Sequence, residues 1–114
     1  MKTILMKNFS RNLICRNKYQ GSDLDVNAEM FRIKHLAELD DQTWWDGEEK
    51  ITLEFEGVDT ISPGFANEAF AYFGIYKNVT WNKFKQKVIL KNISEVKYEI
   101  IRDEVKSGTG EDED

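Results

Sequence analysis

The sequence holds one cysteine, one histidine and one proline among its 114 residues, and these scarcities exclude several kinds of chemistry. A lone Cys15 cannot form an intramolecular disulfide, which fits a reducing compartment. Cys15 and His35 supply too few ligands for a Cys/His metal site, so we expect no metal and no cofactor. The apolar run at the start ends at Lys7, and no stretch approaches membrane-spanning length. We therefore expect a cytoplasmic protein without a membrane contact.

Charge and composition argue against nucleic acid as a partner. The net charge is −5, whereas phosphate-backbone binding needs clustered lysine and arginine. One lysine-rich stretch flanks an apolar segment, and we expect it on the solvated side of a strand: Lys83, Lys85, Lys87 and Lys91. Residues 106–114 contain no apolar residue, which predicts a single domain of residues 1–105 and a disordered acidic tail.

The first half of the chain predicts one or two strands and a helix. Residues 3–9 predict a strand, and Leu13–Cys15 are a candidate second strand. After a break at Gly21–Asp23, a helix is predicted over residues 25–39, with Asp25 as its N-cap. Its apolar residues recur at spacings of three and four, as a buried stripe requires: Val26, Met30, Ile33 and Ala37, widened by Leu36 and Leu39.

The middle of the chain holds the clearest pattern. In residues 50–55, Ile51, Leu53 and Phe55 alternate with polar residues, which predicts a strand with one apolar face. The Ser62-Pro63 pair then predicts the start of a helix, since serine is a preferred N-cap and proline suits the first helical position. The predicted buried stripe of this helix is Phe65, Ala69, Phe73 and Tyr76, widened by Ala66 and Phe70.

The end of the chain predicts one more strand and one more helix. Residues 78–84 form a connection without a clear pattern, and Val88–Leu90 predict a short buried strand. Asn92 and Glu95 have the spacing of a capping box, and a last helix is predicted over residues 93–105. Strands alternating with helices predict an α/β fold: a single-layer mixed sheet of about four strands, with helices packed on one face.

No arrangement of catalytic residues is evident, so we expect no enzymatic activity. Glu54 and Glu56 share a strand face, but no nucleophile or base lies beside them in the sequence. His35 is expected on a helix surface and Cys15 as a small buried residue. Trp44-Trp45, beside an acidic loop, has two interpretations: we expect one tryptophan in the core and leave open whether the other belongs to a binding surface.

Ser62 also has two interpretations. It is an N-cap whose hydroxyl accepts an N–H bond two or three residues on, or it is a phosphoacceptor at a helix N-terminus, where the backbone tolerates an anion.

The segment Ile51–Phe70, with its strand, Ser62-Pro63-Gly64 turn and helix, resembles the STAS-like family of bacterial and phage domains of unknown function. Residues 84–101 also suit that family. The family is similar to the STAS domains of anti-sigma factor antagonists, small switch proteins that dock an ATPase-like kinase. Their turn reads Asp-Ser-Ser-Gly, with its first serine phosphorylated. Here Ile61, Ser62, Pro63 and Gly64 occupy those positions, so the aspartate and the second serine are replaced.

The resemblance implies a regulatory protein–protein interaction module, with an ATPase of the histidine-kinase type as its partner. Ser62 would be its phosphorylation site, and its partner-binding residues would be Asp59, Thr60, Ser62, Pro63, Gly64, Asn67 and Glu68. The alternative is a small-ligand or nucleotide-binding module that holds an anionic group at the helix N-terminus after Ser62.

Overall fold

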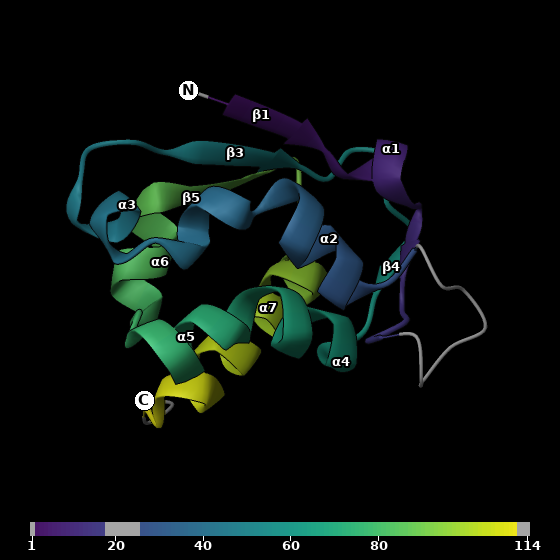
Figure 1. Ribbon diagram of the computed structural model, residues 1–114. Helices are drawn as coiled ribbons and strands as arrows, with labels where there is room; N and C mark the ends of the chain where they lie inside the picture. The colour runs from purple at the N-terminus through teal and green to yellow at the C-terminus, as the bar shows by residue number, and fades with distance from the viewer. Residues whose placement is uncertain (1, 18–25, 112–114) are drawn as a thin grey trace.

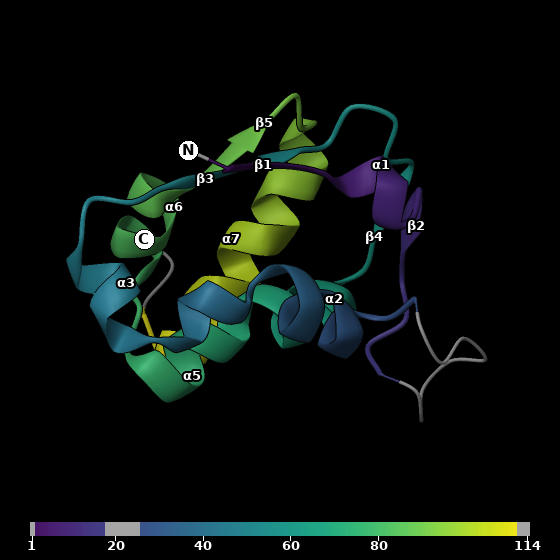
Figure 2. The same ribbon diagram turned by 45° about the horizontal axis from the view of Figure 1, so that its top comes forward.

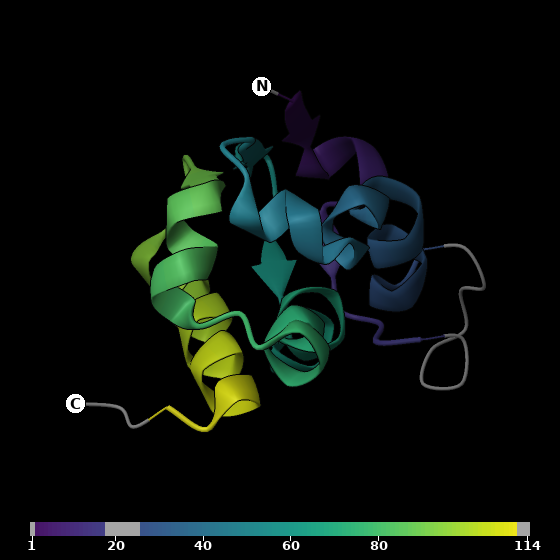
Figure 3. The ribbon, with the colours of Figure 1, turned by 60° about the vertical axis from the view of Figure 1, so that its left-hand side comes forward.

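Three parallel strands form the main sheet of the computed structural model, which describes residues 2–17 and 26–111 (Figure 1). The strands are β1 (Lys2–Leu5), β3 (Ile51–Glu54) and β5 (Val88–Lys91), in the order β1-β3-β5. Figures 1 and 3 show the helices gathered on one side of this sheet. Leu53 of the central strand is fully buried beneath them.

Two further strands form a separate parallel pair, β2 (Asn12–Leu13) with β4 (Thr60–Ile61). The α/β class is therefore confirmed, but one mixed sheet of about four strands is wrong, since the described strands form two sheets and all pair in parallel. Each described pair joins strands that are far apart in the chain. All three described pairs are parallel, and parallel strands need such long crossover connections because a hairpin cannot join them.

The first strand has four residues and is shorter than the predicted strand over 3–9. After β1 the chain forms the helical turn α1 (Met6–Phe9), not the end of a strand over 3–9. Its partner β3 ends at Glu54, which pairs with Leu5, so no ladder remains for residues 6–9. The turn buries Met6 completely. The second predicted strand is displaced, because Ile14 lies beyond β2 and is exposed.

The predicted helix over 25–39 is shorter and buries another face. It comprises α2 (Ala28–His35) and the 3-10 turn η1 (Ala37–Asp40). Asn27 is the N-cap, accepting the N–H of Met30 at 2.9 Å; the proposed cap Asp25 and the break at 21–23 lie outside the described residues. Of the predicted stripe, Leu36 and Leu39 are buried, but Ile33 is 52% exposed, Ala37 is exposed and Met30 is only half-buried. The buried residues are Ala28, Phe31, Leu36 and Leu39.

The helix after Ser62 begins where the sequence predicts. It is continuous through α4 (Pro63–Ala66), the π-helical turn η2 (Asn67–Ala71) and α5 (Tyr72–Lys77). Of its predicted stripe, all residues but one are buried: Phe65, Ala66, Ala69, Phe70 and Phe73. Tyr76 is the exception, because it is 67% exposed on the outer side of the helix.

The unassigned stretch before the last strand contains a helix. It is α6 (Trp81–Lys87), capped by Thr80, whose hydroxyl accepts the N–H of Lys83 at 3.2 Å. Trp81 and Phe84 lie on one face of this helix and are both buried. Their rings are stacked, with centroids 5.8 Å apart. The strand predicted over 88–90 is confirmed as β5, but of its predicted buried residues only Val88 is buried, and Ile89 is 36% exposed.

The last helix, α7 (Glu95–Thr109), is longer than predicted and has another cap (Figure 2). Ser94, not Asn92, accepts the N–H of Lys97, and Asn92 adopts a positive φ of 51° while its amide donates to Glu54. Residues 106–109 are helical, so a disordered tail from 106 is wrong, and 112–114 lie outside the described residues.

The helix α7 approaches the η2 turn closely at a glycine. A Cβ at Gly108 would lie 3.0 Å from the carbonyl oxygen of Ala71 and 3.3 Å from Ile75. A side chain at position 108 would therefore press on the helix that carries the candidate site, and Ile75 lies at the edge between this contact and the exposed side of that helix.

Candidate functional site

The turn between β4 and α4 is held by β2, which runs beside it. The N–H of Ser62 donates to the carbonyl of Leu13 at 2.9 Å, and the N–H of Asp59 donates to that of Arg11 at 2.7 Å. Backbone hydrogen bonds thus join the two segments just before and just after β4 as well. The site turn is therefore fastened to a segment that lies almost fifty residues earlier in the chain.

The hydroxyl of Ser62 has two partners. It accepts the N–H of Phe65 at 3.0 Å, which confirms the predicted N-cap. It also donates to the carbonyl oxygen of Ile14 at 2.8 Å. The second bond was not predicted, since only the pairing of β2 with β4 brings Ile14 to the turn.

This helix start has few free donors for an anion. Pro63 has no N–H, and the N–H of Phe65 is already bonded to Ser62. Anion sites at helix N-termini use just these first amide groups. The alternative of a ligand held at this helix N-terminus therefore gains little support from the geometry.

Two arginines meet on the outer side of the η2 turn. The guanidinium of Arg32 lies 3.0 Å from the carboxylate of Glu68 and 3.7 Å from the ring centre of Tyr72. Arg16 lies 3.8 Å from the other carboxylate oxygen of Glu68 and hydrogen-bonds the side chain of Asn67. Asn67 and Glu68, both predicted as site residues, are thus brought together.

Neither Arg16 nor Arg32 is among the site residues predicted from the sequence. Their signal in the sequence is only a single positive charge within each of two unrelated segments. Both reach Glu68 through contacts between elements: Arg16 follows β2, and Arg32 belongs to α2.

The outer side of η2 and α5 carries exposed apolar and aromatic side chains. Ile75 is 48% exposed and Tyr76 is 67% exposed. They border a small hollow of about 200 Å³, which is also lined by Arg16, Asn67, Glu68 and Tyr72. Large exposed side chains beside arginine are typical of interaction surfaces.

The remaining predicted residues of the turn face solvent. Asp59 is exposed and pairs with Arg11 at 3.5 Å, a pair in which both side chains are more than half exposed. Thr60 and Pro63 are exposed as well, and Gly64 is half-buried. Pro63 and Gly64 lie on the same helix as the η2–α5 hollow, whereas Asp59 and Thr60 precede that helix.

The other candidate residues do not converge. His35 packs against the rings of Phe9 and Phe31, with centroids 5.8 and 5.3 Å away. Burial lowers the pKa of His35, and the positive charges of Lys2 and Lys34 lower it further. Cys15 is half-buried in another segment. Glu54 accepts bonds from the Glu56 N–H and from the Asn92 side chain, which gives it a structural role in a turn.

Both tryptophans are in the core, so the open question about the second has an answer. Trp44 and Trp45, from α3 (Gln42–Asp46), are 7% and 1% exposed. The indole N–H of Trp45 donates to the Leu39 carbonyl at 2.7 Å. Neither ring is displayed to a partner.

Lys87 contradicts the expectation of a solvated lysine stretch. It is 5% exposed, and its ammonium group donates to the carbonyls of Trp44 and Gly47. It also lies 4.4 Å from the centre of the Trp44 ring. Burial lowers the pKa of Lys87, and Lys83 is the next cause. Lys83, Lys85 and Lys91 are exposed as predicted.

Among residues 2–17 and 26–111, no group of three or more histidine, cysteine, aspartate or glutamate side chains is arranged to hold a metal ion. Within the same residues, every helix is too short or too polar to cross a membrane.

Comparison with known protein families assigns the chain to one of them. The family model of the STAS-like domain of unknown function (DUF4325) matches residues 27–97, and the chain belongs to this family. The predicted resemblance is confirmed. No curated protein gives a match, and no solved structure does either.

Proposed function

We propose that this chain is a non-enzymatic regulatory module that binds a protein partner through one surface. This docking surface comprises the predicted turn residues and the outer side of the following helix: Asp59, Thr60, Ser62, Pro63, Gly64, Asn67, Glu68, Tyr72, Ile75 and Tyr76. The exposure of Tyr76 and Ile75 beside an arginine–carboxylate network is the observation that carries the proposal.

Physical arguments support a protein rather than a small molecule at this surface. The hollow beside Tyr76 is small, at about 200 Å³, below the usual volume of a ligand pocket. Tyrosine and arginine are the residues that contribute most to protein interfaces. The π-helical turn at Asn67–Ala71 widens the helix at this point, and such turns are frequent at functional sites.

We further propose that the charge of Ser62 regulates docking. A phosphoryl group on Ser62 would remove the hydrogen that the hydroxyl donates to Ile14 and would place negative charge beside that carbonyl oxygen. The Ile14 segment leads directly to Arg16, which holds Asn67 and Glu68. Release of Ile14 would therefore loosen Arg16 and change the centre of the docking surface.

The family resemblance supports an ATPase related to histidine kinases as the partner. Anti-sigma factor antagonists, to which the family is similar, dock ATPases related to histidine kinases. We propose a partner of this type, in the cytoplasm. Such an enzyme would both bind the docking surface and supply the phosphoryl group.

Intact-mass measurement tests the switch. Protein isolated from its native host should carry one added phosphate in a fraction of molecules, and a Ser62→Ala variant should carry none. Ser94→Ala is the matched control, since Ser94 is also an N-cap serine, and it should keep the added phosphate. Unmodified wild-type protein under all growth conditions would contradict the switch and leave docking itself to be tested separately.

A further inference from the structure

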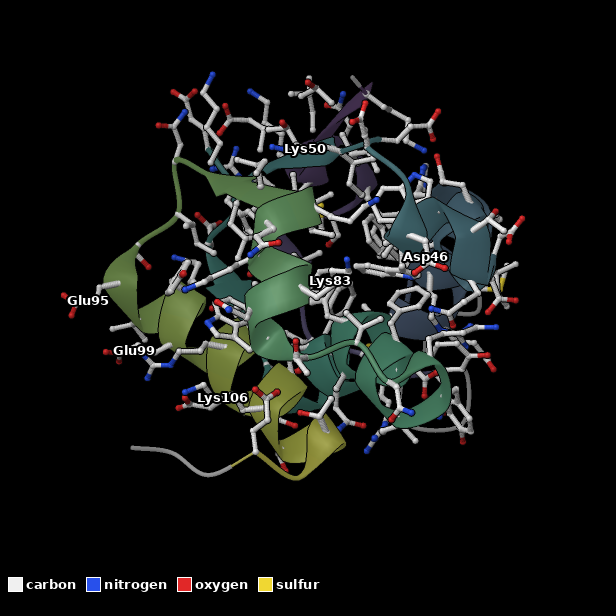
Figure 4. The ribbon with its side chains drawn as sticks, turned by 90° about the vertical axis from the view of Figure 1, so that its left-hand side faces the viewer. Asp46, Lys50, Lys83, Glu95, Glu99 and Lys106 are labelled. Atoms are coloured by element: carbon white, nitrogen blue, oxygen red, sulfur yellow. The ribbon has the colours of Figure 1, made fainter. Side chains whose placement is uncertain are left out.

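Four of the sixteen lysines and arginines converge on one hollow, on the side of the molecule shown in Figure 4. The hollow has a volume of about 510 Å³ and lies between α6, the start of β5 and the loop before β3. Its basic residues are Lys50, Lys83, Lys85 and Lys87. In a chain of net charge −5, this concentration of one sign is unexpected.

The lysines of this hollow form no close ion pair within the described residues, although Asp46 and Glu49 lie near enough to Lys87 to oppose the lowering of its pKa by burial. Six ion pairs join described residues, and none of them includes a lysine of the hollow. Lys87 instead bonds to two backbone carbonyls, which keep its charge but do not cancel it. Glu48 is the one acidic residue among those that line the hollow, so lysines outnumber carboxylates in its lining.

The shape of the hollow indicates which anion it would take. Lysine binds phosphate as a compact point charge, and several lysines around an open hollow suit a chain of phosphates. Among the described residues, no aromatic side chain lines the hollow on which a base could stack. Trp44, the ring closest to Lys87, is almost completely buried.

We infer that this hollow binds the polyphosphate group of a small ligand without selecting a base. Lys83 and Lys85 of α6 and Lys50 before β3 contact the phosphates, while Lys87 supplies a fixed charge at the base of the hollow. The site is separate from the docking surface, which uses the α4–η2–α5 helix, and it does not depend on the proposed function.

Binding of inorganic tripolyphosphate tests this inference. It is measured by calorimetry and by the shift of the thermal unfolding midpoint, each at low and at high salt. Wild-type protein should bind it and unfold at a higher temperature, because a ligand of the native state stabilises that state. Binding should weaken as salt is raised. ATP and GTP should bind with the same affinity as each other.

The variant Lys83→Glu/Lys85→Glu should bind tripolyphosphate at least about tenfold more weakly. Lys34→Glu/Lys97→Glu has the same net charge but alters lysines elsewhere, and it should bind like the wild type. The milder Lys83→Gln/Lys85→Gln pair serves if the glutamates disturb folding. Equal weakening in both glutamate variants, or no binding to wild type, would overturn the inference. Binding of a polyglutamate peptide in place of tripolyphosphate would overturn it too, since the hollow would then recognise an acidic protein segment.

Discussion

The hydroxyl of Ser62 donates a hydrogen bond to the carbonyl oxygen of Ile14, 48 positions earlier, at 2.8 Å. The same hydroxyl accepts the N–H of Phe65. One side chain thus caps a helix and fastens the segment that leads to Arg16. The proposed regulation depends on this double role, and it can be separated from ordinary capping by measurement.

Replacing Ser62 by alanine should cost more stability than removing an ordinary cap. We expect the free energy of unfolding to fall by about 2 kcal/mol, with about 1 kcal/mol from the lost cap and about 1 kcal/mol from the lost bond to Ile14. Ser94→Ala is the control, because Ser94 caps α7 with a bond to Lys97. It should cost about 1 kcal/mol in urea unfolding. Equal losses for the two variants would show that the Ile14 bond contributes nothing.

The ion pair beneath the docking surface should be stronger than one at the periphery. Arg32 and Glu68 have side chains that are 13% and 20% exposed, whereas Lys2 and Glu38 are 44% and 38% exposed. A double-mutant cycle with alanine should give a coupling energy of about 1 kcal/mol or more for the first pair. The second pair should give about 0.5 kcal/mol or less, although its distance of 2.7 Å is shorter than 3.0 Å. The opposite order would contradict a structural role for Arg32.

A larger side chain at Gly108 should disturb the inner side of the docking helix. Gly108→Val would collide with the Ala71 backbone and Ile75, and we expect a loss of about 1–3 kcal/mol. Ser107→Val is the control on the same helix, at an exposed position, and should change stability by about 0.5 kcal/mol or less. Chemical denaturation measures both. A Gly108→Val protein as stable as the control would show that α7 and η2 are not in close contact.

His35 should make the fold less stable in mild acid. Burial and the nearby lysines lower the pKa of His35 in the folded state, so the unfolded chain binds a proton more readily below the ordinary value of 6.5. Stability from this group is therefore present above that pH and is lost as pH falls below it. His35→Phe keeps the ring contacts to Phe9 and Phe31 and should lack this part of the pH dependence. If the stability of the two proteins changed in parallel between neutral and mildly acidic pH, His35 would not be the source of this pH dependence.

Much of the fold could be predicted from short stretches of neighbouring residues. Ser62-Pro63 marks a helix start by its own chemistry, and the alternation around Leu53 marks a central strand, so both were predictable from neighbouring residues. The start of α6 has a local signal of the same kind, an N-cap threonine at Thr80 followed by Trp81 and Phe84 at helical spacing.

Contacts between distant segments were not predictable. The Ile14 bond and the Arg16 contacts depend on β2 pairing with β4, and two-residue strands leave almost no pattern in a sequence. Lys87 is buried because two carbonyls of the α3 region face it, which no property of the lysine itself indicates. The main sheet became three parallel strands for a similar reason, since strand partners are set by the crossovers.

The most direct test of the docking surface compares two kinds of exposed position. Ile75→Asp/Tyr76→Asp changes the proposed surface, and Val96→Asp changes an equally exposed residue on α7, 68% against 67% for Tyr76. Each protein is used as bait in native-host extract, and a captured ATPase of the histidine-kinase type is then titrated against the purified variants. The account predicts that wild type and Val96→Asp bind this ATPase equally, while the double variant binds at least about tenfold more weakly. Undiminished binding by the double variant, or loss of binding by Val96→Asp, would contradict a docking surface on the helix after Ser62.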